Sequence, residues 1–260
     1  MLSKAERDTC ADILIAAARE RKQAVQLSTT YPAITIEDAY AISSEVAQRR
    51  IKGGAKLVGH KVGLTSKAMQ ASSQIDEPDF GYLLDNNLVE NGAKLKHADF
   101  CVPRVEAELT FVLKKPLKGP GVGLLDVLRA TEYVVPSIEV IDARVQNPRK
   151  IFDTVSDNGA AAGLIMGGRP IGPDELDLRW VGAIMYRNTE VEETGLAAGV
   201  LSHPAMGVAW LANKLGSLGT PLEAGHLVLS GSFIRPVWAN KGDTLHADFG
   251  PLGSVNCQFI

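Results

Sequence analysis

Residues 103–113, PRVEAELTFVL, place two glutamates two positions apart at the start of a run that is otherwise apolar. The residues from Leu109 to Leu113 are typical of a strand in a protein core. Side chains alternate between the two faces of a strand, so Glu106 and Glu108 project the same way. Because two like charges side by side repel each other, the chain must fold so that positive charge from elsewhere lies between them.

A second core-like stretch, SIEVIDARV at 137–145, carries a third glutamate, Glu139. A carboxylate on a buried strand must be paired, neutralised or bound to a metal. Three carboxylates on two strands offer the hard oxygen ligands that Mg²⁺ and Mn²⁺ prefer, and they leave three octahedral positions for water and substrate. Ion pairs with a nearby arginine, such as Arg104 or Arg144, are the alternative. The spacing alone leaves both interpretations open.

The composition is that of a soluble globular protein with a sizeable core. Of the 260 residues, 45% are hydrophobic and 22% are charged, which suits one large domain or two small ones. A net charge of −3 without a basic stripe argues against a nucleic-acid partner, and the apolar runs are far too short to span a membrane. No secretory signal pattern and no paired cysteines are present, so we expect a cytoplasmic protein.

The first part of the chain is predicted to be largely helical. Helices are expected at 4–26 and 36–52, the second starting with a capping-box-like TIED at 35–38 and ending at Gly53-Gly54. A strand at 55–64 and a short helix near 66–72 follow. The Pro/Gly-containing segment DEPDFGYLL at 76–84 is predicted to be a loop.

Strands dominate from residue 100 onward. We expect them at 105–114, 134–143, 182–188, 226–233, 244–249 and 253–260. Two helices interrupt them, at 124–133 and 203–219, and in the second Ser202 is the expected N-cap and Pro204 lies in the first turn. Because helices and strands do not alternate strictly, we predict an α+β fold with a mixed sheet. A helical region, 1–80, is expected to pack on a β-rich body, 81–260, as one compact unit.

Other candidate residues have ordinary explanations as well as functional ones. Lys61, in GHKVGLTS at 59–66, lies in a short apolar strand, where a desolvated lysine titrates lower and can donate a proton or stabilise charge. A solvated strand lysine is the more common case. His60 would point to the opposite face and is interpreted as structural. Asp79 is either a base that faces a pocket or a turn residue. Nucleotide-binding and serine-hydrolase patterns are absent from the sequence.

Taken in order, these segments resemble those of the 2-oxopent-4-enoate hydratase and 4-oxalocrotonate decarboxylase family, within the fumarylacetoacetase-like superfamily. The resemblance spans essentially the whole chain and rests on GHKVGLTSKAMQASSQIDEPDFGYLL, PRVEAELTFVL, PSIEVIDAR, DTVSDN, LSHPAMGVAWLANKL, LSGSFIRPV and GPLGSVNCQFI. It implies that Mg²⁺ or Mn²⁺ is held by Glu106, Glu108 and Glu139. It also implies a mixed, β-rich fumarylacetoacetase-like body with a helical N-terminal region, and a homo-oligomer that is often a ring-like decamer.

Within that family the likeness is greatest to hydratases, which are carbon–oxygen lyases, of homoprotocatechuate breakdown. Such enzymes add water to the small-molecule substrate 2-hydroxyhepta-2,4-diene-1,7-dioate and form 4-hydroxy-2-oxoheptane-1,7-dioate. The resemblance implies that Lys61 stabilises the enolate and that Asp79 is the acid/base. Further polar contacts to the substrate map to Ser156, Asn158 and Ser232.

The second carboxylate of a dioate needs a partner, because enclosing it unpaired would be costly. Arg235 in GSFIRPV, at 231–237, is our candidate, since a guanidinium can hold a carboxylate by two parallel hydrogen bonds. Arg144, Arg149 and Lys150 are other candidates for the same role.

Several other functions are weighed against this one. A 2-hydroxypenta-2,4-dienoate hydratase would use a five-carbon monoacid. A 4-oxalocrotonate-type decarboxylase would use the same metal and enolate, but such enzymes tend to have an apolar residue in place of Asp79. A hydrolase that cleaves a carbon–carbon bond needs a water-activating His-Glu arrangement, which the sequence lacks. A non-catalytic assembly partner would not need the ligand set together with Lys61 and Asp79.

Overall fold

The computed structural model describes residues 1–67, 70–71 and 75–260, and the short helix expected near 66–72 lies partly outside them. The helices are α1 (Lys4–Glu20), α2 (Leu27–Thr30), α3 (Ile36–Lys52), α5 (Leu124–Ala130), α6 (Ile151–Ser156) and α7 (Pro204–Ser217). None of the helices in these residues is both long and apolar enough to cross a membrane.

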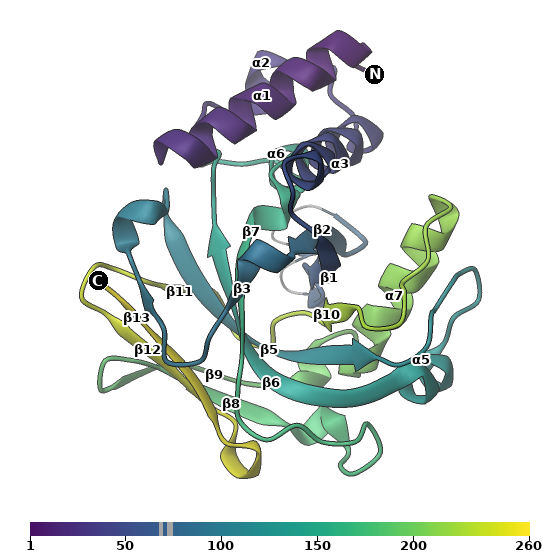
Figure 1. The fold of residues 1–260 in the computed structure, drawn as a ribbon, viewed down its shortest axis with the longest axis vertical. Coiled ribbons are helices and arrows are strands. Elements are labelled where there is room, and N and C mark those ends of the chain that lie inside the picture. Colours follow the sequence, from purple (N-terminus) through teal and green to yellow (C-terminus); the bar gives the residue numbers. More distant parts are fainter. Residues whose placement is uncertain (68–69, 72–74) are drawn as a thin grey trace.

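Two mixed sheets form the body of the protein (Figure 1). The larger sheet runs in the order β2 (Asp79–Leu84), β1 (Leu57–Gly63), β10 (Leu227–Leu229), β5 (Pro103–Leu113), β6 (Thr131–Asp142), β7 (Ala161–Met166) and β3 (Leu88–Val89), and β11 (Val237–Trp238) also pairs with β5. The smaller sheet runs β4 (Lys94–Leu95), β13 (Ser254–Phe259), β12 (Thr244–Asp248), β8 (Gly182–Arg187) and β9 (Glu190–Leu196). Both sheets mix parallel and antiparallel pairs, so the predicted α+β class is confirmed.

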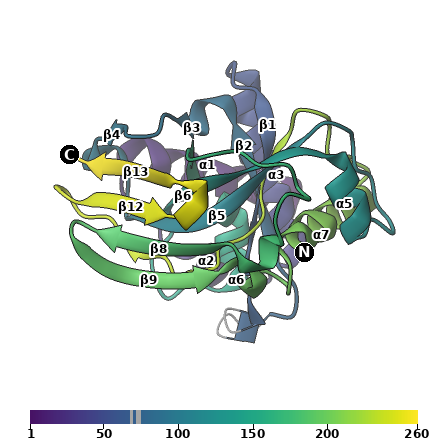
Figure 2. The ribbon, with the colours of Figure 1, turned by 90° about the horizontal axis from the view of Figure 1, so that it is seen from below.

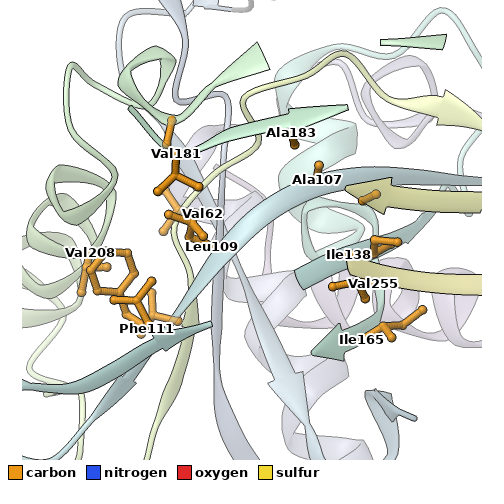
Figure 3. Close-up of a cluster of buried hydrophobic side chains, with 14 of the residues drawn as sticks. Val62, Ala107, Leu109, Phe111, Ile138, Ile165, Val181, Ala183, Val208 and Val255 are labelled. Atoms are coloured by element: carbon orange, nitrogen blue, oxygen red, sulfur yellow. The ribbon is translucent and has the colours of Figure 1, made fainter. Parts of the chain in front are cut away.

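The main core lies between the two sheets. Figure 2 shows the smaller sheet lying across β5 and β6. Alternate residues of β5, such as Ala107 and Leu109, are buried in one cluster with Ala183 of β8 and Val255 of β13 (Figure 3). Because side chains alternate along a strand, Glu106 and the residues two positions before and after it lie on the opposite face of the larger sheet. The functional side chains therefore lie on the face that the smaller sheet leaves uncovered.

The N-terminal helices have a small core of their own. Buried apolar side chains of α1 and α3, among them Leu14 and Ile42, pack with Val145, which follows β6. The capping box predicted at the start of α3 is present: Thr35 Oγ1 accepts from the Asp38 backbone N–H, and the Asp38 carboxylate accepts from the Thr35 N–H. The helix α1 ends earlier than predicted because Arg21 adopts a left-handed conformation.

The boundary expected near residue 80 falls inside β2. With β1, this strand belongs to the larger sheet, so the part that packs separately consists of α1, α2 and α3. The division into a region 1–80 and a body 81–260 stays a prediction.

Three local expectations were wrong. The helix expected at 124–133 ends at Ala130, and its last three residues already belong to β6. The segment predicted to be a loop at 76–84 forms β2 from Asp79 onward, because each of its strand residues pairs with β1 and most are buried. At the start of α7, the cap is His203 rather than Ser202: the Nδ1 of His203 accepts from the Ala205 N–H at 3.1 Å. Pro204 occupies the first turn as predicted.

One buried ion pair fixes the segment that follows β6. Arg144 donates from Nε to Asp157 Oδ1 at 2.5 Å and from its backbone N–H to Oδ2 at 2.7 Å. A further guanidinium N–H donates to the Asp157 carbonyl at 2.6 Å. Arg144 is therefore held by Asp157 and does not pair with the glutamates of β5 and β6, which was one of the two interpretations of the sequence.

We predict that Asp157→Asn lowers the free energy of unfolding by about 3–5 kcal/mol, since it leaves the buried Arg144 without its counter-charge. Denaturant unfolding would measure the change. Asp177→Asn is the matched control, because Asp177 pairs with Arg179 on the surface and its loss should have little measurable effect. Equal stability of Asp157→Asn and the wild type would show that the pair does not anchor this segment.

Candidate active site

The three glutamates singled out by the sequence meet on one patch of the larger sheet. Glu106 of β5 lies directly opposite Glu139 of β6 in the antiparallel register, and opposite residues share a face. Glu108, two residues further along β5, projects from the same face. Carboxylate oxygens of all three lie within 4.8 Å of one another. Glu108 is 1% exposed and Glu139 is 0% exposed.

This cluster lacks the hydrogen bonds that buried carboxylates normally have. Glu108 Oε2 accepts from the Gly231 backbone N–H at 2.9 Å, but neither oxygen of Glu139 has a hydrogen-bond partner. Burial raises the pKa of Glu139 to about 8, against the lowering effect of the Lys61 charge. Burial, and then the charges of Glu139 and Glu106, hold the pKa of Glu108 well above its ordinary value. Three crowded carboxylates, of which Glu139 has no hydrogen-bond partner, offer the hard oxygen ligands that a divalent cation requires.

Lys61 and Asp79 lie beside the cluster on β1 and β2. The Lys61 Nζ is 4.0 Å from Asp79 Oδ1 and 4.0 Å from Glu139 Oε1. Both side chains are buried, and neither carboxylate oxygen of Asp79 has a hydrogen-bond partner. Asp79 is thus the first residue of a buried strand and not a surface turn residue.

Lys61 does not titrate lower, as a desolvated lysine by itself would. Burial does act to lower its pKa, but the surrounding carboxylates, Glu139 first and then Asp79, outweigh burial and raise it. Lys61 is therefore a cation in this setting. Its neighbour His60 is buried against the rings of Phe80 and Tyr82, in agreement with the structural role expected for it.

Two glycines let these side chains approach one another. A Cβ on Gly159 would lie 2.4 Å from Lys61 Cε, and Gly159 has a φ of +59°. A Cβ on Gly63 would lie 2.2 Å from Asp79 Oδ1. Any other residue would push against Lys61 or Asp79, so both positions require glycine. No local sequence pattern predicts the role of these two glycines, because it depends on close packing across three segments.

A cavity of about 530 Å³ opens above the carboxylates. Lys61, Asp79, Glu106 and Glu108 line one end. Ser232 also lines it, although its hydroxyl is engaged with the backbone and donates to the Ile234 carbonyl at 2.8 Å.

Three arginines also line the cavity: Arg104, Arg149 and Arg235. The remaining wall is mostly uncharged and includes Glu193. Arg104 lies two positions before Glu106 on β5, so strand alternation was a signal for its placement that the sequence analysis did not use. The cavity is therefore lined by both carboxylates and guanidinium groups.

Relatives of known name match the chain from end to end, although a scan against models of protein families finds no match. The chain is 56% identical to 2-oxo-hept-4-ene-1,7-dioate hydratase of Escherichia coli, over 100% of both sequences. The chain belongs to the 2-oxopent-4-enoate hydratase and 4-oxalocrotonate decarboxylase family. Among solved members of this family, 4-oxalocrotonate decarboxylase from Pseudomonas putida G7, complexed with magnesium and adipate, is 36% identical with a TM-score of 0.97, over 100% of this chain and 99% of that one.

The fold of this hydratase and decarboxylase family extends to more distant enzymes. Fumarylpyruvate hydrolase from Pseudomonas aeruginosa has a TM-score of 0.64 at 12% identity, over 77% of this chain and 88% of that one. That likeness concerns the fold alone, and it agrees with the fumarylacetoacetase-like body expected from the sequence.

The structure does not bring Ser156 and Asn158 to the cavity of the glutamates. Both line a second cavity of about 140 Å³, between the N-terminal helices and β2. The Asn158 side chain accepts from the Tyr82 N–H at 2.7 Å and donates to the Tyr82 carbonyl at 3.0 Å, so it ties its segment to β2. Gly159, the next residue, reaches the main cavity. The contribution of Asn158 in this structure is to support the strand that holds Asp79.

We predict that the metal-free protein becomes less stable, relative to Glu139→Gln, as the pH rises from about 4.5 to about 8. The pKa of Glu139 is higher in the folded state, about 8, than its ordinary value of 4.5. Folding therefore favours the protonated form, and its contribution to stability is lost as the pH rises through that interval. Glutamine cannot ionise, so the variant lacks this loss.

Denaturant unfolding in the presence of a chelator, at several pH values, would measure the difference in unfolding free energy between the two proteins. A difference that does not change with pH would mean that Glu139 is ionised throughout.

Proposed function

We propose that this protein is a divalent-metal-dependent hydratase that adds water to 2-hydroxyhepta-2,4-diene-1,7-dioate and forms 4-hydroxy-2-oxoheptane-1,7-dioate, in the breakdown of homoprotocatechuate. The observation that carries the proposal is the group of three glutamates, two of them buried, beside Lys61 and Asp79, in a chain that is 56% identical along its length to 2-oxo-hept-4-ene-1,7-dioate hydratase.

The residues that would hold the metal are Glu106, Glu108 and Glu139, whose clustered carboxylate oxygens suit a hard cation; those of Glu139 have no hydrogen-bond partner. We propose Mg²⁺, with Mn²⁺ as the alternative, since a solved relative is complexed with magnesium. Such an ion, when bound, supplies Lewis-acid stabilisation of negative charge on the oxygen at C2 of the substrate.

Lys61 is proposed to stabilise the enolate. Its ammonium group is buried, and the carboxylates around it keep it charged. A cation held in a site without water interacts strongly with charge that develops on the substrate. Because Lys61 lies 4.0 Å from Glu139, it adjoins the place where the C2 oxygen would lie.

Asp79 is proposed to be the acid/base. Both of its carboxylate oxygens are buried without a hydrogen-bond partner, and the residue lines the cavity. Protonation of the dienol at C5 gives a 2-oxo-3-enoate, in which C4 is electrophilic. Asp79 can deliver the proton to C5 or take one from the water that adds at C4.

A 4-oxalocrotonate-type decarboxylase is the second candidate, and the TM-score of 0.97 to such an enzyme favours it. Loss of CO₂ needs the metal and the stabilised enolate but no proton transfer to or from a water molecule. The buried Asp79, whose carboxylate oxygens have no hydrogen-bond partner, is therefore the feature that favours hydration. A 2-hydroxypenta-2,4-dienoate hydratase would use the same groups on a shorter monoacid.

We also propose that the protein acts as a cytoplasmic homo-oligomer, such as a decamer. The outer side of the smaller sheet exposes apolar side chains, including Ile184, Val191 and Leu196, which is typical of a surface that another chain covers.

Product analysis would test the proposed function. The wild type with Mg²⁺ is expected to convert 2-hydroxyhepta-2,4-diene-1,7-dioate to the 4-hydroxy-2-oxo acid without releasing CO₂. Glu106→Gln, Glu108→Gln and Glu139→Gln should each lose metal affinity and turnover while they keep the fold, because each removes a charged ligand. Glu132→Gln, an exposed position on the strand of Glu139, is the matched control. CO₂ release from a dienol diacid, or full activity of all three variants after chelator treatment, would contradict the proposal.

We predict that Asp79→Asn lowers the hydration rate about 10²- to 10⁴-fold, the contribution usual for a general acid/base, while Mg²⁺ affinity changes far less. Lys61→Ala should behave in the same way, because it removes the charge that stabilises the enolate. Turnover and calorimetric metal binding, measured on the same samples, would separate the two effects. A wild-type rate in Asp79→Asn would leave Asp79 with only a structural role and would reopen the decarboxylase interpretation.

A further inference from the structure

The three arginines of the cavity differ in whether they form an ion pair with an acidic residue. Arg235 pairs with Glu193 at 2.7 Å, and its side chain is 79% exposed at the mouth of the cavity. Arg104 and Arg149 are both partly buried, and in the described part of the chain neither has an acidic partner within ion-pair distance. The Arg104 Nε is buried without a hydrogen-bond partner.

Two neighbouring guanidinium groups without an acid are an unusual arrangement. Burial, and then the charge of Arg104, lower the pKa of Arg149. Arg104 is also held in place, because its guanidinium lies 4.8 Å from the ring centroid of Trp238. Two guanidinium groups side by side in a cavity wall repel each other, and an anion bound between them would offset that repulsion.

The spacing between Arg104 and Glu106 along β5 indicates how long such an anion would be. Arg104 and Glu106 project from the same face two residues apart, which corresponds to about 7 Å along a strand. An extended seven-carbon diacid has its two carboxylates separated by a similar length. A substrate with one end at the glutamates therefore brings its other carboxylate level with Arg104, beside Arg149. A five-carbon monoacid has no group to place there.

We propose that Arg149, together with Arg104, binds the distal carboxylate of the dioate and that Arg149 is a specificity-determining residue. This inference rests on the proposed function and deepens it. It departs from the sequence-based choice of Arg235, which must give up its pair with Glu193 before it can bind a substrate and is screened by solvent at the mouth. Arg144, another sequence-based candidate, is fully engaged with Asp157.

The test compares two substrates across a set of variants. Arg149→Gln should lower kcat/KM for 2-hydroxyhepta-2,4-diene-1,7-dioate by about ten- to a hundred-fold, chiefly through KM, because a charged hydrogen bond to the ground state is lost. For 2-hydroxypenta-2,4-dienoate the change should stay within about two-fold. Arg149→Lys should recover part of the loss, since it restores the charge but not the paired hydrogen bonds. Arg235→Ala should cost the dioate less than Arg149→Gln does.

An equilibrium measurement supports the kinetic one. Binding of 2-oxoheptanedioate, which has two carboxylates, should weaken in Arg149→Gln, while binding of 2-oxopentanoate should not. Arg169→Ala is the matched control, because Arg169 is a surface arginine paired with Glu175, and it should leave both ligands and both substrates unaffected.

The outcomes separate this inference from the proposed function. Equal losses on both substrates, or wild-type binding of 2-oxoheptanedioate by Arg149→Gln, would overturn the role of Arg149. A dioate-selective loss in Arg235→Ala alone would overturn it too and would place the distal carboxylate at the mouth. A wild type that hydrates neither substrate would overturn the proposed function, and the binding comparison would then still decide whether Arg149 recognises a second carboxylate.

Discussion

The electrostatic cost of three crowded carboxylates, two of them buried, is the constraint on which the rest of the site depends. Glu106, Glu108 and Glu139 lie within reach of a single ion, yet within the described part of the chain a single backbone N–H, that of Gly231, donates to them. Folding holds them together because strand pairing between β5 and β6 is supported by the apolar face beneath, where Ala107 and Leu109 meet the smaller sheet. The core thus provides the stability, and the opposite face of the same strands carries the negative charge that a cation and Lys61 can offset.

The cavity that results is lined by charges of both signs. Carboxylates lie beside Lys61, and the guanidinium groups of Arg104, Arg149 and Arg235 belong to the same wall. In the proposed binding mode, the dioate lies with one end at the three glutamates and the other beside Arg149. The orientation of the substrate and the preference for its chain length would then have one origin. The strand β5 carries Arg104, Glu106 and Glu108 on the same face.

The sequence predicted much of this site because strand alternation is a local rule. The E-x-E spacing in PRVEAELTFVL requires that Glu106 and Glu108 share a face wherever the strand goes, and the apolar run predicts that the other face is buried. Family resemblance added Lys61 and Asp79 to the same site, and the structure brings both beside the glutamates. Local composition predicted the wrong secondary structure around Asp79. DEPDFGYLL has the composition of a loop, and it becomes a strand from Asp79 onward only by pairing with β1.

By itself, then, the sequence predicted β1, β5, β6, β8, β12 and β13, the buried face of β5, the α+β class and the three clustered glutamates, because these follow from side-chain period and composition; it did not predict β2, β7 or β9. Only the tertiary structure decided which polar residues share the cavity. Ser156 and Asn158 lie close to Gly159 in sequence but line a different cavity, because a left-handed turn separates their side chains from it. Arg144 and Arg149 are five residues apart, yet one is held by Asp157 and the other faces the cavity. Such differences depend on contacts between segments far apart in the chain, which no local pattern encodes.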